Sequence, residues 1–201
     1  MGERQRQRSR WVWYGGRLSI DFVNTLRDRF AGGRELLCAP EDLAAWCEAA
    51  GLTGEGRIAV DERALMAARE LREAVDAGVV AVVREQPFPP AAVRTLNDWL
   101  AHDPGEPPRL ELADGVPVLR SEPPATEWAG ALHRIAADAA EILGGDGRAR
   151  LRICDGVGCS ARFVDKSVGR RRRWCQMATC GNRAKAAQFR RSATAGGASP
   201  A

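Results

Sequence analysis

Lysine, histidine and tyrosine are scarce in this sequence, and long apolar runs are absent from it. Lysine occurs at two of 201 positions, so arginine carries nearly all of the positive charge, a bias typical of a GC-rich bacterial genome. No apolar run reaches the ~18 residues that a membrane-spanning helix requires. The basic N-terminus lacks the apolar core of a secretory signal. These absences predict a cytoplasmic protein without membrane contact.

Sequence patterns of enzymes are missing as well. The chain has no nucleophile–base pair, no phosphate-binding glycine loop and no carboxylate pair with an evident partner. The two histidines, His102 and His133, fall in helical patterns, and we interpret them as ordinary surface or core residues. The sequence therefore predicts a protein that is not an enzyme. An enzyme with a purely structural metal site is the alternative, and turnover by residues 11–147 alone would reveal it.

The net charge of +4 is distributed unevenly along the chain. Residues 148–201 contain 13 basic and two acidic residues, a balance of +11, whereas residues 1–147 carry −7. Such asymmetry predicts a polyanionic partner for the C-terminal part. A solvated basic tail is the alternative interpretation.

Four of the six cysteines form two close pairs. Cys154 and Cys159 are one pair, Cys175 and Cys180 the other, each with four intervening residues. Structural zinc takes four tetrahedral ligands, usually supplied as two close pairs. In a reducing compartment this pattern predicts one zinc ion per chain, with two disulfides or a redox site as the alternative.

The remaining cysteines, Cys38 and Cys47, lie far from this cluster. We expect them to be buried or incidental, and a disulfide between them is the alternative.

The residues around the four cysteines predict a treble-clef-like zinc finger. Gly156 and Gly158 allow the first pair to form a tight knuckle, and the flanking "RLRIC" and "ARFVD" predict a small hairpin. The second pair lies where a helix begins, so backbone N–H groups can stabilise thiolates there. A module this small depends on metal for its folding. We therefore expect zinc removal to unfold residues 148–191 and to leave much of the N-terminal domain intact.

Basic residues surround the start of this helix, where they can follow a phosphate backbone. Arg183, Asn182 and Gln188 have side chains that can read base edges. For Asn182, capping the helix or bonding a thiolate is an equal alternative. We expect Trp174 to pack against Phe163 and Phe189 in a small core. The predicted interface with double-stranded DNA consists of Arg170, Arg171, Arg172, Arg173, Asn182, Arg183, Lys185, Gln188, Arg190 and Arg191.

The N-terminal part predicts a mostly helical α+β domain with small antiparallel strands. Alternation of Leu18, Ile20 and Phe22 predicts a strand after a Gly-Gly turn. Helical patterns cover residues 39–51, 61–84 and 91–101, the last with Val93, Leu96 and Leu100 inward, and a further helix follows a predicted cap at Thr126. "RLELADGVPVL" predicts a hairpin. The expected organisation is a disordered arm (1–10), this domain (11–147), the finger (148–191) and a disordered tail (192–201).

Three polar residues, Asp21, Asn24 and Thr25, lie in an apolar part of this domain. They could line a pocket for a small-molecule effector. The structural interpretation, which we favour, is that they satisfy buried backbone groups or cap a turn.

The chain resembles the bacterial CGNR zinc-finger proteins with an N-terminal ABATE domain. The eponymous motif is Cys180-Gly181-Asn182-Arg183, and "FVDKS" and "RRRRWCQMATCGNRAKAAQFR" also resemble that family. "GGRLSIDFVNT" and "EDLAAWCEAAGL" are similar to the ABATE domain, so the resemblance spans residues 11–191. It implies the four zinc ligands named above and a stress-induced transcription regulator. "DKSVGRR" departs from the family by lacking an arginine after the serine.

These observations predict a DNA-binding transcription regulator. Its C-terminal finger would contact DNA, and its N-terminal domain would sense an effector or form a homodimer. The alternative is an RNA- or protein-binding zinc module with no role at promoters.

Overall fold

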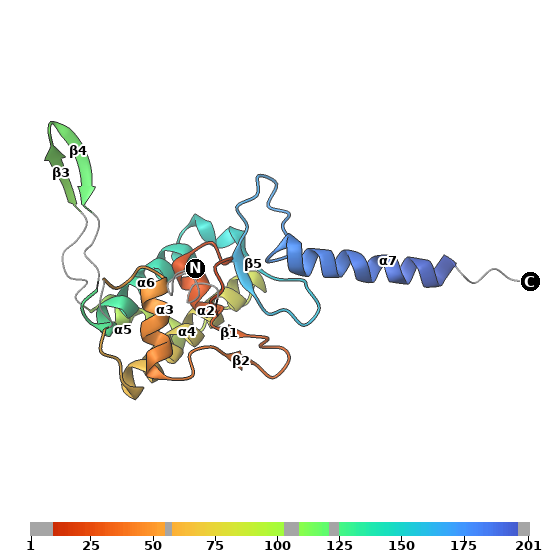
Figure 1. Cartoon of the computed structure of the whole chain (residues 1–201), viewed down its shortest axis with the longest axis horizontal. Coiled ribbons are helices and arrows are strands. Elements are labelled where there is room, and N and C mark those ends of the chain that lie inside the picture. The colour runs from red at the N-terminus through yellow and green to blue at the C-terminus, as the bar shows by residue number, and fades with distance from the viewer. Residues whose placement is uncertain (1–9, 55–57, 103–108, 121–124, 197–201) are drawn as a thin grey trace, which may run out of the picture.

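A computed structural model describes residues 10–54, 58–102, 109–120 and 125–196. Its centre is α4 (Glu62–Val83), which contacts four other helices (Figure 1). The four helices are α2 (Leu18–Val23), α3 (Pro40–Ala49), α5 (Pro90–Leu100) and α6 (Trp128–Gly144).

The central helix α4 lies where the sequence predicted a helix. Asp61 caps α4, because its side chain accepts a hydrogen bond from the backbone N–H of Ala64 at 2.8 Å. The predicted apolar ladder is buried from Leu65 through Val79. The helices predicted at 39–51, 61–84 and 91–101 are confirmed. The helix predicted after Thr126 is also confirmed as α6, although Glu127 occupies its N-cap and no side chain caps it.

The strand predicted around Leu18–Phe22 is wrong, because these residues form α2. This short helix packs against α4, α6 and the finger, so Ser19, Ile20, Phe22 and Val23 are all buried. A helix covered on most sides shows no 3.6-residue periodicity. Its apolar residues can then mimic the alternation of a strand.

Helix α5 is less buried than its sequence predicted. Leu96 faces the core as expected, but Val93 and Leu100 are 42% and 37% exposed. These two side chains line an open apolar groove of about 230 Å³ between α5 and α6.

Within the described part of the chain, three two-stranded antiparallel sheets accompany the helices, which confirms the α+β class. One is the predicted hairpin of β3 (Arg109–Ala113) and β4 (Val116–Arg120). Its turn residues Asp114 and Gly115 both have positive φ, and it projects away from the helical body (Figure 1). The other sheets are β1 (Leu26–Arg27) with β2 (Arg34–Glu35), and β5 (Leu151–Ile153) with β6 (Arg162–Val164).

The β5–β6 hairpin belongs to the finger, yet it is built into the N-terminal domain. Leu151 and Val164 lie in the main hydrophobic core, and the N–H of Val164 donates to the carbonyl of Gly15 at 2.7 Å. Arg162 is 2% exposed and forms a two-pronged ion pair with Asp76 of α4, at 2.7 and 3.1 Å. The expectation that the two parts unfold separately therefore needs revision.

The chain ends in the turn η2 (Met177–Gly181) and the helix α7 (Asn182–Gly196), which extends away from the body (Figure 1). Residues 192–196 were predicted to be disordered, but they continue α7. Alanine, a strong helix former, occupies two of these five positions. At the other end, Arg10 of the predicted disordered arm pairs with Asp42 at 2.7 Å. Residues 1–9 and 197–201 of the predicted arm and tail lie outside the described residues.

Among the described residues, every helix is too short or too polar to cross a membrane.

The ion pair between finger and body yields a stability prediction. Asp76→Asn leaves the buried Arg162 guanidinium without its counter-charge, and breaking a buried pair typically costs about 3–5 kcal/mol. We expect urea denaturation to show a loss in the free energy of unfolding of this size. The matched control is Asp155→Asn, which breaks an exposed pair with Arg173 and should cost under about 1 kcal/mol. Equal losses in both variants would contradict the role assigned to Arg162.

Candidate zinc centre

The first cysteine pair lies in a knuckle that follows β5. Gly158 has a φ of +72°, a conformation that favours glycine. A Cβ on Gly156 would lie 3.0 Å from both Cβ and Sγ of Cys180. The sequence predicted positive φ for both glycines, which the structure shows at Gly158; Gly156 instead lets the knuckle approach the second cysteine pair.

The four sulfurs form a cluster of the size that one zinc ion needs. They all lie within 4.8 Å of one another, and adjacent pairs are 3.9 Å (Cys159–Cys175) and 3.7 Å (Cys175–Cys180) apart. Tetrahedral zinc with bonds of about 2.3 Å places its sulfurs about 3.8 Å apart. All six cysteines are free thiols, so the disulfide alternatives receive no support.

Hydrogen bonds favour a thiolate at Cys154. The Cys159 and Cys175 thiols, with the backbone N–H groups of Cys175 and Gly156, lower the pKa of Cys154 well below its usual range. Hydrogen bonding with Cys154, followed by burial and by the negative charge of Cys154, raises the pKa of Cys159 and of Cys175. A divalent cation removes this mutual repulsion, because metal binding stabilises thiolates.

A small hydrophobic core supports the cluster. Phe163 of β6 is fully buried beside the cysteines, and Trp174 and Tyr14 pack against them. The predicted contact of Trp174 with Phe189 is wrong, because Phe189 lies on α7 and is 76% exposed. Instead, Tyr14 of the N-terminal domain takes part in this core.

The loop before Cys175 holds its four arginines in different environments. Buried Asp165 fixes the loop by accepting the N–H of Arg172 at 2.9 Å. The Arg172 guanidinium donates to the carbonyls of Trp174 and Cys175 and lies over the Phe163 ring. Arg172 therefore stabilises the finger itself, whereas the sequence predicted that it contacts DNA phosphate. Arg170 and Arg171 are exposed, and exposed Arg173 pairs with Asp155.

The predicted DNA-contacting residues of α7 lie on its surface. Asn182 is the first residue of the helix, and its side-chain amide donates to the carbonyl of Ala178 at 3.2 Å. The other five are exposed: Arg183, Lys185, Gln188, Arg190 and Arg191.

The three candidate effector residues all contact protein atoms. Asn24 exchanges two hydrogen bonds of 2.9 Å with the backbone of Arg162. Thr25 donates to the carbonyl of Phe22 and accepts from Arg72, and Asp21 accepts the N–H of Gly15 at 2.7 Å. These contacts agree with the structural interpretation, in which the three residues satisfy groups of the protein itself.

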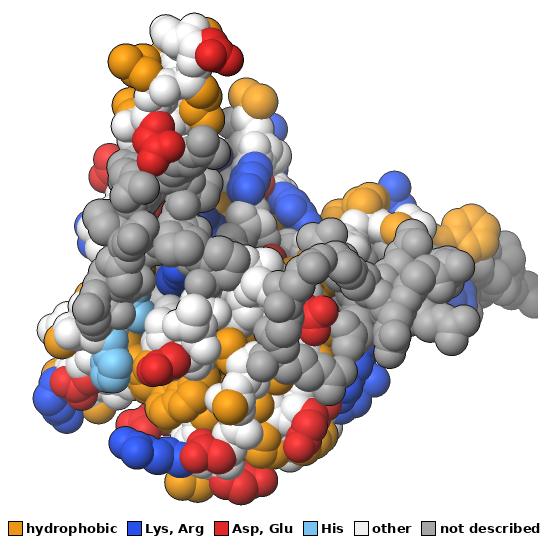
Figure 2. Space-filling model, turned by 60° about the vertical axis from the view of Figure 1, so that its left-hand side comes forward, with side chains coloured by type: hydrophobic (Ala, Val, Ile, Leu, Met, Phe, Trp, Pro, Cys, Tyr) orange, Lys and Arg blue, Asp and Glu red, His pale blue; other side chains and the backbone are white. Residues whose placement is uncertain are grey.

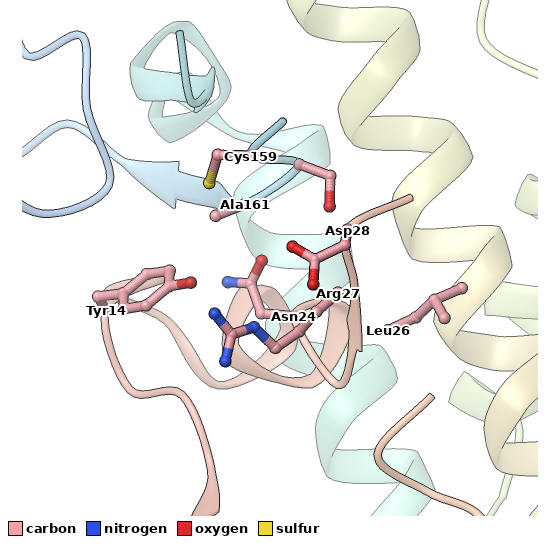
Figure 3. A pocket seen from close by; sticks show the side chains of 8 residues that line it. Tyr14, Asn24, Leu26, Arg27, Asp28, Cys159 and Ala161 are labelled. Carbon is pink, nitrogen blue, oxygen red and sulfur yellow. The ribbon is translucent and has the colours of Figure 1, made fainter. Parts of the chain in front are cut away.

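Asn24 also borders a small cavity between the N-terminal domain and the finger (Figure 3). Its volume is about 10 Å³, roughly the space of one water molecule. Asp21 and Thr25 do not line it. The cavity walls are formed by Tyr14, Asn24, Leu26, Arg27, Asp28, Cys159, Ser160 and Ala161.

The fold and the cysteine cluster define a helical α+β protein that carries a treble-clef-like zinc finger. Residues 16–146 match the ABATE family, described as "Putative stress-induced transcription regulator", and residues 150–193 match the CGNR zinc finger. The chain belongs to the ABATE family and carries a CGNR finger, which confirms the resemblance. Cys154, Cys159, Cys175 and Cys180 are its zinc-binding cluster, for one ion. A comparison with curated proteins found no match.

Sequence reasoning missed residues that support the site from outside the finger. Tyr14 is the chain's one tyrosine, and burial, followed by charge on Cys175, raises its pKa above the ordinary value. Asp76 looked like a polar position on an amphipathic helix. Neither has a local pattern that connects it to cysteines more than 70 residues away.

Asp21 yields a prediction of pH dependence. Burial raises its pKa from 3.8 to about 6, with the negative charge of Asp138 adding to the shift and the Gly15 N–H opposing it. Between these pH values the folded state holds more protons than the unfolded state, so stability falls as pH rises through this window. The loss approaches about 3 kcal/mol above pH 6.

Asp21→Asn keeps an acceptor for Gly15 and removes the charge. We expect this variant to be more stable than the wild type at pH 7.5, with the advantage shrinking toward pH 4. Chemical denaturation across this range measures it. Both proteins share the zinc site, so their difference isolates Asp21, and the exposed Asp98→Asn serves as control. A pH-independent difference would contradict the assignment.

Proposed function

We propose that the chain is a transcription regulator that binds double-stranded DNA through its zinc finger and α7, in the bacterial cytoplasm. The family description supports a regulator. The DNA contact rests on one observation: α7 projects from the body as a basic helix whose basic residues are exposed (Figure 1). The proposal assigns no catalytic step to the chain.

The helix is long enough for a groove. Its 15 residues span roughly 22 Å, and the major groove of DNA is about 12 Å wide and admits an α-helix. The metal cluster holds its first turn, since Cys180 lies in η2 directly before α7. The finger thereby fixes the direction of the helix.

The two faces of α7 differ. With 3.6 residues per turn, Arg183 and Arg190 lie on one face with Ala187 between them. A small alanine there allows the backbone to approach DNA closely. Lys185 lies on the opposite face, close to Phe189. We therefore assign DNA contact to the Arg183–Arg190 face. Lys185, which the sequence predicted to be part of the interface, lies on the opposite face and is left out of this proposal.

The test compares single alanine variants on the two faces. Arg183→Ala should weaken binding to the best DNA site by roughly 1–3 kcal/mol if the residue reads a base, with less effect on random DNA. Lys185→Ala removes the same charge from the other face and should change affinity much less. Fluorescence anisotropy at several salt concentrations measures both.

Three results would change the proposal. Equal losses from the two variants would mean that charge alone drives binding. Equal losses on specific and random DNA would make Arg183 a phosphate contact. Tighter binding to RNA than to duplex DNA, or no nucleic-acid binding, would favour the RNA- or protein-binding alternative.

The expected homodimer has a suitable surface in the β3–β4 hairpin. In its register Leu110 faces Leu119 and Leu112 faces Pro117, so these four residues share one side of the hairpin. The three leucines are 60–77% exposed, and Figure 2 shows apolar side chains on the projecting arm. We place the dimer contact here, because a face without charge can pack on its own copy around a two-fold axis.

This contact is small, which sets the expected strength. The face of two five-residue strands measures about 17 by 10 Å, an area of roughly 170 Å². This area is far below the ~800 Å² per partner of a standard interface. A weak, concentration-dependent dimer should appear in analytical ultracentrifugation. Leu110→Ser with Leu119→Ser should abolish it, whereas Val168→Ser, at a fully exposed apolar residue of the finger, should not. A monomer at all concentrations, or equal dimerisation of all variants, would exclude this surface.

A further inference from the structure

The zinc cluster has a neighbour that the finger itself does not supply. Tyr14 precedes α2 in the N-terminal domain, yet its side chain packs in the small core that contains all four cysteines. Burial, followed by the negative charge on the neighbouring Cys175, raises the pKa of the Tyr14 hydroxyl above its ordinary value. In Figure 3, Tyr14 and Cys159 approach the same cavity from two separate parts of the chain.

Tyr14 is held in place from two directions. The next residue, Gly15, donates its N–H to Asp21 and accepts the N–H of Val164 in β6, each at 2.7 Å. A side chain at this position would meet the backbone N of Asp21 at 2.8 Å, so glycine allows the tight contact. The backbone next to Tyr14 is thus held by α2 and by the finger strand together.

A hydrogen bond to a metal-bound thiolate changes its chemistry. A donor removes part of the negative charge from the sulfur and fixes its direction, and the loss of such an outer partner typically costs 10–100-fold in metal affinity. The finger donates backbone N–H groups of Gly156 and Cys175 to Cys154. Tyr14 packs against the cluster that contains Cys175, and its O–H group is a side-chain donor of the kind that a thiolate accepts.

We propose that the Tyr14 hydroxyl donates a hydrogen bond to the zinc-bound sulfur of Cys175, so that the N-terminal domain completes the zinc site. Zinc affinity then depends on the folded N-terminal domain. By thermodynamic linkage, zinc in turn stabilises the segment around Tyr14 and α2. This inference is independent of what α7 binds.

The first test replaces Tyr14 by Phe in the full chain, which keeps the ring and deletes the hydroxyl. Competition with a chromogenic chelator should show zinc affinity reduced 10–100-fold. In the cobalt-substituted protein, the sulfur-to-metal charge-transfer band should move to lower energy, because Cys175 regains electron density. Loss of packing alone would not move this band in that direction.

The matched control is Thr179→Val. It deletes a hydroxyl group one residue from Cys180, but that hydroxyl bonds to the Gln176 side chain at 3.4 Å. In this variant the zinc affinity should stay within twofold of the wild-type value. The cobalt charge-transfer band should not shift. An unchanged affinity in Tyr14→Phe would overturn the proposal. So would a reduced affinity with an unmoved band, since Tyr14 would then act through packing.

A measurement on the wild-type chain keeps the proposal testable if the variant fails to fold. Hydrogen–deuterium exchange of peptides covering residues 13–23 is compared with zinc and with chelator. The proposal expects at least tenfold faster exchange without zinc. Exchange of these residues that is independent of zinc would overturn the linkage, whatever happens in the finger.

Discussion

The Arg162 guanidinium forms the central polar contact between the finger and the helical body. It is a buried cation on a finger strand, and Asp76 of α4 accepts two hydrogen bonds from it. The carbonyl of Ser160 accepts a third hydrogen bond, and the Asn24 amide pairs with the Arg162 backbone. Removing the Asp76 charge would leave the Arg162 guanidinium buried without the carboxylate that pairs with it, whereas Asp76 also pairs with Arg29 at 3.4 Å.

The position of α7 follows from this contact. Arg162 fixes β6, and β6 carries Phe163, against which the cysteine cluster packs. The cluster fixes η2, and α7 continues from η2 without a flexible joint. The contacts around Asp76 and Asn24 therefore contribute to the position of the exposed basic helix.

The sequence was sufficient for features whose determinants are local. The two cysteine pairs, Gly156 and the charge of α7 predicted the zinc site and its exposed helix, because ligand spacing and knuckle geometry are local properties. The helical pattern of apolar residues from Leu65 onward likewise predicted α4. Alternation failed for α2, because burial by three partners removed the periodicity that distinguishes a helix from a strand.

Features that depend on long-range contacts were not predictable in this way. Arg172 looked like its three arginine neighbours, but the ring of Phe163 and two backbone carbonyls engage it. Gly144, Gly145 and Gly147 lie at the predicted domain boundary, and the hydrophobic core continues across it through Leu151 and Val164. The finger and the helical body therefore share one core although they differ in charge and composition. Because the finger contributes to the main core, metal binding and packing of the body stabilise the same folded state, and neither can be lost without cost to the other.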